Sequence, residues 1–257
     1  MVVGRRRLGA AFGLWAISTA CLPASGWTKD DPANGGDKKA PPTKVTIAIV
    51  GDSLADGLWG AIYRKLYRDK HVTVYRGAKN SVGFGASDLL DMLDRAFEGP
   101  VDAVVMMIGA NDRRGIYGSD GKLAAAYHSP QWPAVYRDRV DRFMDSATSH
   151  GVPLVWVLLP VMRDDGADSD GRQVNSIICE AADGRPLVAT LPTRPLTVDA
   201  DGKYSAYLKD AKGQQRLVRD TDGIHFAEHG YEMIADRILA KLDDLSVKIG
   251  IQTSSAK

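Results

Sequence analysis

Short apolar runs alternate with amphipathic segments between residues 44 and 245. The runs are too short for helices and rich in β-branched residues, so each is predicted to be a strand. The run VDAVVMMI at 101–108 is apolar at nearly every position, which is typical of a strand covered on both faces. The predicted strands are 45–50, 72–75, 101–108, 154–159 and 187–191.

Between these runs, apolar residues recur every three or four positions, which is the period of a helix with one buried face. The last such segment places Tyr231, Ile234 and Ile238 on one face. By contrast, 163–175 contains the acidic stretch DDGADSDG and is predicted to be a solvated loop after the fourth strand. The predicted helices are 54–69, 86–97, 134–149 and 227–245.

This order of elements predicts an α/β fold. Strands separated by helices imply right-handed crossovers, and therefore a three-layer α/β/α sandwich with a mostly parallel sheet. Such sheets bind their ligands at the carboxyl ends of the strands. The turns after the predicted strands are therefore the places to search for chemistry, and the loop at 163–175 is placed to rim a site there.

The first 26 residues have the organisation of a bacterial export signal. Three Arg at 5–7 precede an apolar stretch at 8–22 that is too short to span a bilayer, and small residues follow at 23–26. An uncleaved membrane anchor, lipidation at Cys21 and a twin-arginine route are the alternatives.

The segment 27–43 reads WTKDDPANGGDKKAPPT, has almost no side chains for a core and is predicted to be a flexible linker. One domain is therefore expected at 44–250. The signal predicts a periplasmic or secreted protein with no stable membrane insertion after cleavage.

Charge and cysteine content exclude several classes of protein. Lys and Arg number 33 and Asp and Glu 32, so the chain lacks the basic excess of a nucleic-acid-binding protein. The two cysteines, Cys21 and Cys179, lie far apart and outside any zinc-ligand spacing. Next to Ile177 and Ile178, Cys179 is predicted to be buried and inert.

Three predicted turns carry groups capable of chemistry. The sequence GDSL at 51–54 follows the first strand and puts the Ser53 hydroxyl near a helix N-terminus, where a developing anion is favoured. A glycine-rich loop at 76–85 follows the second strand, and GAND at 109–112 follows the third. The amide of Asn111 can donate two hydrogen bonds. Taken singly, each is better explained as a helix cap or a turn.

The sequence DGIH places Asp222 three residues before His225, just ahead of the last predicted helix. A carboxylate at this spacing can hold imidazole Nδ1–H and leave Nε2 free to take a proton, although a polar capping turn explains the motif alone. A nucleophile, oxyanion donors and an oriented base on successive loops together predict ester hydrolysis through an acyl-enzyme.

These blocks resemble, in content and order, those of the SGNH (GDSL-type) serine hydrolase superfamily, over most of residues 45–245. The later segment resembles a poorly characterised branch found in bacterial exported proteins. The resemblance implies the flavodoxin-like SGNH hydrolase fold, with Ser53 as the nucleophile and Asp222 and His225 as its partners.

The resemblance also implies an oxyanion hole formed by the N–H groups of Ser53 and Gly83 and by the side-chain amide of Asn111. The match of the second block is loose, so Gly77 and Gly85 compete with Gly83.

Other kinds of site fit less well. His225 and His229 are four residues apart, but HExxH and a third ligand are missing. The acidic stretch at 164–171 departs from EF-hand spacing, and neither a dinucleotide nor a phosphate-loop motif occurs. GDSLA at 51–55 lacks the second Gly of the α/β-hydrolase GxSxG elbow. We expect neither a metal nor a cofactor.

The sequence therefore predicts an exported serine esterase acting on O-acyl esters, with O-acetyl groups of a cell-wall or extracellular polysaccharide favoured over a small acylated molecule. A lysophospholipase, a thioesterase and an acyltransferase with the same triad are alternatives. A non-catalytic glycan-binding component of a polymer export machine is the alternative from another class. Trp132 and Tyr204 would suit stacking on a sugar ring if they flank the cleft.

Overall fold

The computed structural model describes residues 44–85 and 89–247. Outside the described residues lie the predicted signal at 1–26, the linker at 27–43, the start of a predicted helix at 86–88 and the domain end at 248–250. None of the helices within the described ranges is both long and apolar enough to cross a membrane.

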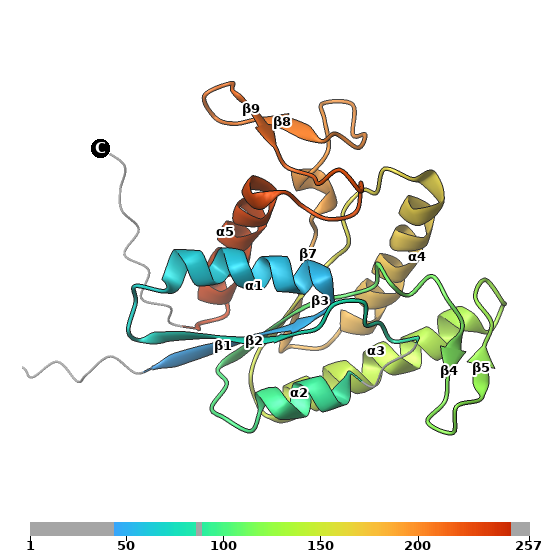
Figure 1. Ribbon diagram of the computed structural model, residues 1–257. Helices are drawn as coiled ribbons and strands as arrows, with labels where there is room; N and C mark the ends of the chain where they lie inside the picture. The colour runs from blue at the N-terminus through green and yellow to red at the C-terminus, as the bar shows by residue number, and fades with distance from the viewer. Residues whose placement is uncertain (1–43, 86–88, 248–257) are drawn as a thin grey trace, which may run out of the picture. The chain divides into compact units, whose positions relative to one another are not determined.

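Five parallel strands form the central sheet: β1 (Val45–Gly51), β2 (Val72–Ala78), β3 (Ala103–Met107), β6 (Leu154–Val157) and β7 (Val188–Leu191). Their order is β2-β1-β3-β6-β7, which is the flavodoxin-like order (Figure 1). Both neighbours of β1 are reached by crossovers, so the carboxyl ends of β1 and β3 border the switch point where ligands bind. β3 is buried along its whole length, as its apolar run predicted, and β6 is buried along its whole length too.

Five α-helices of the described ranges cover the sheet: α1 (Ser53–Leu66), α2 (Leu90–Ala96), α3 (Trp132–Ser149), α4 (Asp165–Ala182) and α5 (Glu228–Asp244). α1 and α5 pack together on one face, and α2, α3 and α4 cover the other (Figure 1). The contact of α1 with α5 is close because Gly57 leaves room for a ring: a Cβ there would lie 2.0 Å from Tyr231. The predicted three-layer sandwich is confirmed.

A buried aromatic cluster anchors the loop that follows β2. Phe84 is 3% exposed, stacks on Trp156 of β6 at 6.1 Å between centroids and meets Tyr136 of α3 edge-on at 5.6 Å. Burial of such rings is a large stabilising contribution, and edge contacts add to it. The glycines on either side, Gly83 and Gly85, are therefore held against the core.

The prediction of a solvated loop at 163–175 is wrong, because α4 begins at Asp165. The composition of DDGADSDG is poor for a helix, but Asp164 caps its start by accepting the N–H of Ala167 at 2.7 Å. A buried apolar stripe then follows the helical period, and it includes Val174 and Ile178.

Two buried polar side chains fix α4 to the segment after β6. Asn175 accepts the N–H of Leu159 at 2.8 Å and donates to its carbonyl at 2.9 Å. Asp168 accepts the N–H of Met162 at 3.0 Å. These long-range bonds offset the weak helix propensity of the first turns, and they leave no periodic signal in the sequence.

Three short elements were not predicted from the sequence. Two are hairpins, β4 (Ile116–Tyr117) with β5 (Leu123–Ala125) and β8 (Tyr207–Lys209) with β9 (Gln215–Leu217), and the third is the 3-10 helix η1 (Arg194–Leu196). Their strands are two or three residues long and largely exposed, so no alternating pattern marks them. The prediction for Cys179 is wrong too: its thiol is exposed, because one helical step turns it away from buried Ile178.

Candidate active site

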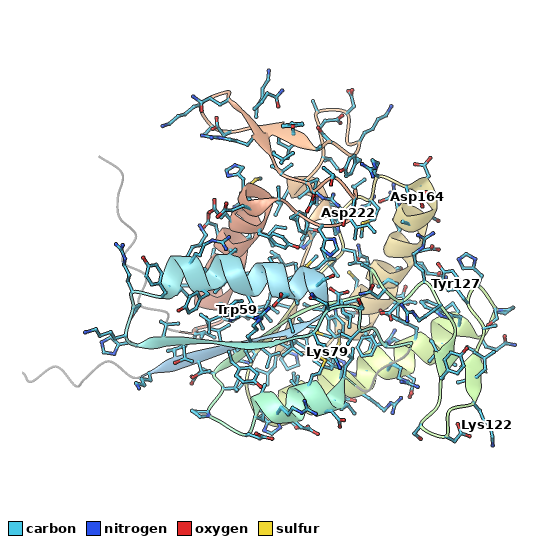
Figure 2. The ribbon with its side chains drawn as sticks, viewed as in Figure 1. Trp59, Lys79, Lys122, Tyr127, Asp164 and Asp222 are labelled. Carbon is cyan, nitrogen blue, oxygen red and sulfur yellow. The ribbon has the colours of Figure 1, made fainter. Side chains whose placement is uncertain are left out.

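The three side chains predicted to form a triad meet at the carboxyl edge of the sheet. Ser53 Oγ lies 2.7 Å from His225 Nε2, and His225 Nδ1 lies 2.5 Å from Asp222 Oδ2. Figure 2 places Asp222 beside the amino-terminal end of α1, where Ser53 stands. This is the continuous hydrogen-bonded chain of hydroxyl, imidazole and carboxylate that acyl transfer to a serine requires.

In the turn that carries Ser53, the residue that caps helix α1 is its neighbour Asp52 and not the serine. Asp52, not Ser53, is the N-cap of α1 and accepts the N–H of Leu54 at 2.9 Å, which leaves the serine hydroxyl to His225. Gly51 has φ +137°, and a Cβ there would lie 2.0 Å from the carbonyl oxygen of Met107. The strand can therefore end against β3 only with glycine at this position.

The Asp222 carboxylate is held by its own loop. Oδ1 accepts the N–H of Ile224 at 2.8 Å and that of His225 at 2.9 Å, while Oδ2 faces the imidazole. Burial raises the pKa of Asp222, but the hydrogen bonds from His225 and Ile224 outweigh it and lower the pKa to about 2. The orienting group is thus ionised throughout the range in which esters are assayed.

The amide of Asn111 links the two segments that carry the other predicted oxyanion donors, because its partners Asp52 and Val82 directly precede Ser53 and Gly83. Asn111 Nδ2 donates to the carbonyl of Val82 at 3.1 Å and to Asp52 Oδ2 at 3.3 Å. The first bond fixes the amide. The second bond is long and therefore weak. An oxyanion bound by the Asn111 amide would take the place of Asp52 as the acceptor of this bond.

Among the three competing glycines, the structure favours Gly83. Gly85 already donates its N–H to Asp112 Oδ1 at 3.2 Å. Gly77 lies inside β2, in register with Val50 of β1. The role of Gly83 as a donor stays a prediction.

Two buried residues, Asp112 and Tyr136, support the site but carry no assigned role in the sequence-based prediction. Asp112 is 2% exposed and accepts from the Tyr136 hydroxyl at 2.8 Å as well as from Gly85. Burial raises the pKa of Asp112 to about 6 and that of fully buried Asp52 to about 7, and the charge of Asp112 raises the pKa of Asp52 further. The GAND motif contained Asp112, but nothing in the sequence paired it with Tyr136.

Replacing Gly83 by alanine is expected to lower kcat on a short ester by about 10²- to 10³-fold, the usual effect of losing one oxyanion donor. The new Cβ would lie 2.2 Å from Asp112 Oδ1, and Tyr136 and Gly85 hold that carboxylate in place. The loop must therefore shift. Steady-state kinetics test this, with Gly99→Ala as control, because a Cβ there meets no atom within 4 Å. An unchanged kcat would assign the donor elsewhere.

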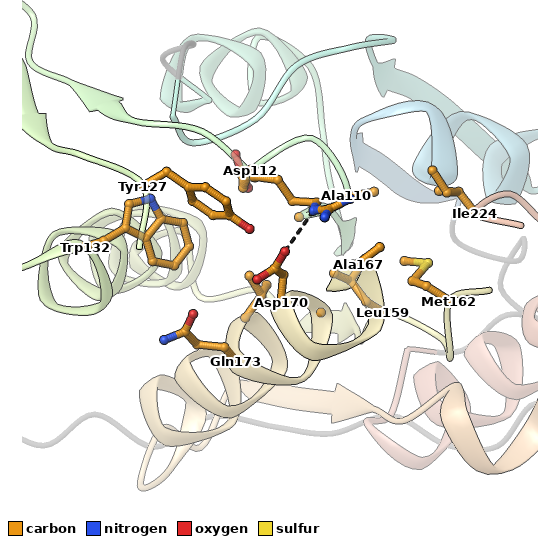
Figure 3. A pocket seen from close by; sticks show the side chains of 14 residues that line it. Ala110, Asp112, Tyr127, Trp132, Leu159, Met162, Ala167, Asp170, Gln173 and Ile224 are labelled. Atoms are coloured by element: carbon orange, nitrogen blue, oxygen red, sulfur yellow. Dashed lines mark hydrogen bonds and ion pairs between the residues drawn. The ribbon is translucent and has the colours of Figure 1, made fainter. Parts of the chain in front are cut away.

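A pocket of about 30 Å³ is lined in part by residues that directly precede candidate site residues in the sequence (Figure 3). Gly109 and Ala110, which precede Asn111, line one side, and Ile224, which precedes His225, lines another. At the pocket edge, Arg113 Nε pairs with Asp170 Oδ2 at 2.8 Å, drawn as the dashed line in Figure 3. The remaining wall is mainly apolar and includes Leu159, Met162, Ala167 and Val174.

The structure does not support a sugar platform at Trp132. Its side chain is 2% exposed, donates from Nε1 to the Arg114 carbonyl at 2.9 Å and stacks on Tyr136 at 4.7 Å. Tyr204 is half-buried and lies under the guanidinium of Arg219 at 5.1 Å. Trp132 contributes to the pocket wall but is almost fully buried, and one face of Tyr204 is covered by Arg219.

His229 lies 3.8 Å from Glu232, outside the hydrogen-bonded chain of His225. In the described part of the chain, no three or more His, Cys, Asp or Glu residues are grouped so that they could hold a metal ion.

Comparison with protein families matches residues 46–241 to a family described as "Protein of unknown function (DUF459)". A comparison with curated proteins gives no significant match.

Solved structures with a similar fold include an alpha/beta hydrolase enzyme from the metagenome of Lake Arreo, Spain (19% identity, TM-score 0.54, covering 79% of this chain and 97% of that chain). A GDSL-like lipase from Bacteroides thetaiotaomicron is 12% identical (TM-score 0.52, covering 78% and 88%). A member of the lipolytic protein G-D-S-L family from Veillonella parvula is 18% identical (TM-score 0.51, covering 76% and 97%). At these identities the comparisons establish the fold, which is the one that the resemblance to the SGNH (GDSL-type) superfamily implies.

Proposed function

The chain belongs to the DUF459 family, and we propose that it is an exported serine esterase that hydrolyses short O-acyl esters. The favoured substrate is an O-acetyl group on a cell-wall or extracellular polysaccharide. The observation that carries the proposal is the chain of hydrogen bonds from Ser53 through His225 to Asp222. The compartment rests on the signal-like segment with its three Arg at 5–7.

In the first half of the reaction, Ser53 Oγ attacks the ester carbonyl carbon while His225 Nε2 takes the hydroxyl proton. Asp222 stabilises the imidazolium through Nδ1–H. The oxyanion receives hydrogen bonds from the N–H groups of Ser53 and Gly83 and, in exchange for Asp52, from the Asn111 amide.

His225 then gives its proton to the leaving alcohol, and the acyl group stays on Ser53. In the second half, water attacks the acyl carbon and His225 takes a proton from it. The tetrahedral intermediate breaks down to the carboxylic acid and restores the serine hydroxyl. An acceptor alcohol in place of this water would make the same site an acyltransferase.

The size of the pocket favours short acyl groups. Its volume of about 30 Å³ is room for roughly two water molecules. Leu159, Met162 and Val174 give it an apolar wall suited to a methyl group. A long acyl chain would need these side chains to move.

We therefore expect turnover of p-nitrophenyl esters to fall in the order acetyl, butyryl, octanoyl. Leu159→Ala is expected to raise the octanoyl-to-acetyl ratio of kcat/KM about tenfold, the effect of burying roughly two more methylene groups. The control is Leu123→Ala, because Leu123 is 53% exposed on the β4–β5 hairpin. A ratio that does not respond would remove the pocket from substrate recognition.

Substrate class is tested by incubating the purified protein with an O-acetylated polysaccharide and, separately, with a lysophospholipid. The proposal expects release of acetate from the polysaccharide and no release of fatty acid from the lipid. Transfer of acetyl to an added oligosaccharide, without free acetate, would establish an acyltransferase instead. Binding of the polysaccharide with no turnover of any ester would establish a glycan-binding component.

A further inference from the structure

Arg219 lies at the base of the loop that carries Asp222 and His225, and it is fully buried. Its guanidinium donates to four backbone carbonyls. Nη1 reaches that of Val161 at 2.5 Å, and Nη2 reaches those of Ile224 at 2.8 Å and Gly223 at 3.3 Å. Nε reaches the carbonyl of His225 at 3.3 Å.

Burial of the Arg219 guanidinium at this position is unfavourable, because its charge is removed from water. Burial lowers the pKa of Arg219 to about 10. Its hydrogen-bond partners in the described ranges are these carbonyls and, at 3.9 Å, the sulfur of Met162, not carboxylates. The rings of Tyr204 and Phe226 flank it at 5.1 and 4.9 Å. The charges of Asp222 and Asp168 raise the pKa of Arg219 but do not offset its burial. A side chain that only filled this space would be apolar, since burying a charge without a hydrogen-bonded anion costs free energy.

The guanidinium matches the shape of the loop. Three consecutive carbonyls, those of Gly223, Ile224 and His225, turn inward to the planar group. Arg219 also pairs with Phe226 in an antiparallel bridge that closes the loop. Arginine has five donors in a fixed fork, so it can hold several carbonyls at once, which a lysine ammonium cannot do with the same geometry.

The other side of the same loop holds the chemistry. The N–H groups of Ile224 and His225 face the Asp222 carboxylate, while their carbonyls face Arg219. Each of these peptide groups is thus fixed from both sides. Loss of the guanidinium would take the donor from the carbonyls of Val161 and Ile224, whereas those of Gly223 and His225 would keep the N–H groups of Arg163 at 3.1 Å and of Asp220 at 2.9 Å. The loop would then turn the Ile224 carbonyl toward water.

We propose that Arg219 is a positioning residue: it fixes the backbone of 222–225 so that the Asp222–His225 pair stays aligned with Ser53. The proposal rests on the proposed function, because it assigns Arg219 a part in that reaction. Under this proposal, replacing Arg219 lowers kcat because His225 is misaligned, and substrate binding is unchanged.

The kinetic test compares Arg219→Met and Arg219→Lys with the wild type. The expected result for Arg219→Met is a fall in kcat of about 10²-fold with KM within about twofold, the usual scale for a misaligned catalytic group. Arg219→Lys should recover part of that loss. The control is Arg185→Met, just beyond the carboxyl end of α4, which removes a bond from Nε to the Ala181 carbonyl and bonds from Nη1 and Nη2 to Asp145 and Asp141 of α3. It should leave kcat unchanged.

A double-mutant cycle separates alignment from general damage. Without the imidazole there is nothing left to align, so Arg219→Met should cost little further activity in a His225→Ala background. An equal fall in both backgrounds, or no fall in the wild-type background, would overturn the proposal.

Hydrogen exchange tests the positioning claim without any turnover. The amides of Ile224 and His225 should exchange faster in Arg219→Met, whereas those of α1 should not. If the wild type shows no esterase activity that depends on Ser53, the proposed function fails, and this measurement still tests the loop. Unchanged exchange at 224 and 225 would refute the role of Arg219 itself.

Discussion

Replacing Ser53 by alanine is expected to lower kcat for p-nitrophenyl acetate by about 10³-fold or more, the usual cost of removing a triad member. The hydroxyl is the group hydrogen-bonded to His225 Nε2 at 2.7 Å. The fold should survive, because Asp52 and not Ser53 caps α1. The measurement is kcat for the purified wild type and variant, with thermal unfolding of both to show that stability is kept.

The matched control is Ser176→Ala, since Ser176 is an exposed serine of α4 whose hydroxyl bonds Glu180 at 3.0 Å. It should turn over like the wild type. Equal rates for Ser53→Ala and the wild type would place the nucleophile elsewhere. If both proteins are folded and inert on every ester, the glycan-binding alternative becomes the one to pursue.

Replacing Asp222 by asparagine is expected to lower kcat by about 10⁴-fold, the scale known for this change in serine proteases. The amide oxygen can still accept the N–H groups of Ile224 and His225, so the loop is kept. The amide nitrogen, however, would donate to imidazole Nδ1. That bond holds the ring proton on Nε2, where it blocks acceptance of the serine proton.

The control for this change is Asp199→Asn, because Asp199 accepts backbone N–H groups of Asp201 and Lys203 in a comparable turn. It should keep full activity. Similar losses in both variants would show that turn geometry, not the orientation of imidazole, is being measured.

The pH dependence follows from the lowered pKa of Asp222. The pKa in the folded state, about 2, lies below the unfolded value near 3.9. The contribution of this carboxylate to stability is therefore present above the unfolded value and is lost as the pH falls toward 2. Titration of Asp222 should not limit activity at neutral pH.

The central strands and the candidate site residues could be predicted because short, local sequence patterns mark them. β3 and β6 are apolar because they are covered on both faces, and Ser53 and Asn111 lie in the segments that follow β1 and β3, at the edge where a parallel sheet gathers its loops. Such signals are local, so they survive in the sequence. The catalytic roles themselves stay predictions.

What the sequence analysis missed depends on contacts between distant residues. Helix α4 has a poor first turn and is held by Asn175 and Asp168, whose partners lie in another segment. Tyr136 and Asp112 are 24 residues apart, and Arg219 reaches back 58 residues to Val161. No periodicity marks such partners, because each depends on where the fold puts two backbones.

The bond between Ser53 and His225 joins residues 172 positions apart, one at the first strand of the sheet and one just before the last helix. A contact between residues so far apart carries a loop-closure cost that contacts within a helix do not, so it is expected to form after them. A partly folded chain would therefore carry all the groups of the candidate triad without their assembled geometry. During refolding, the return of activity would time the docking of the final segment, whereas circular dichroism would already report the earlier helices.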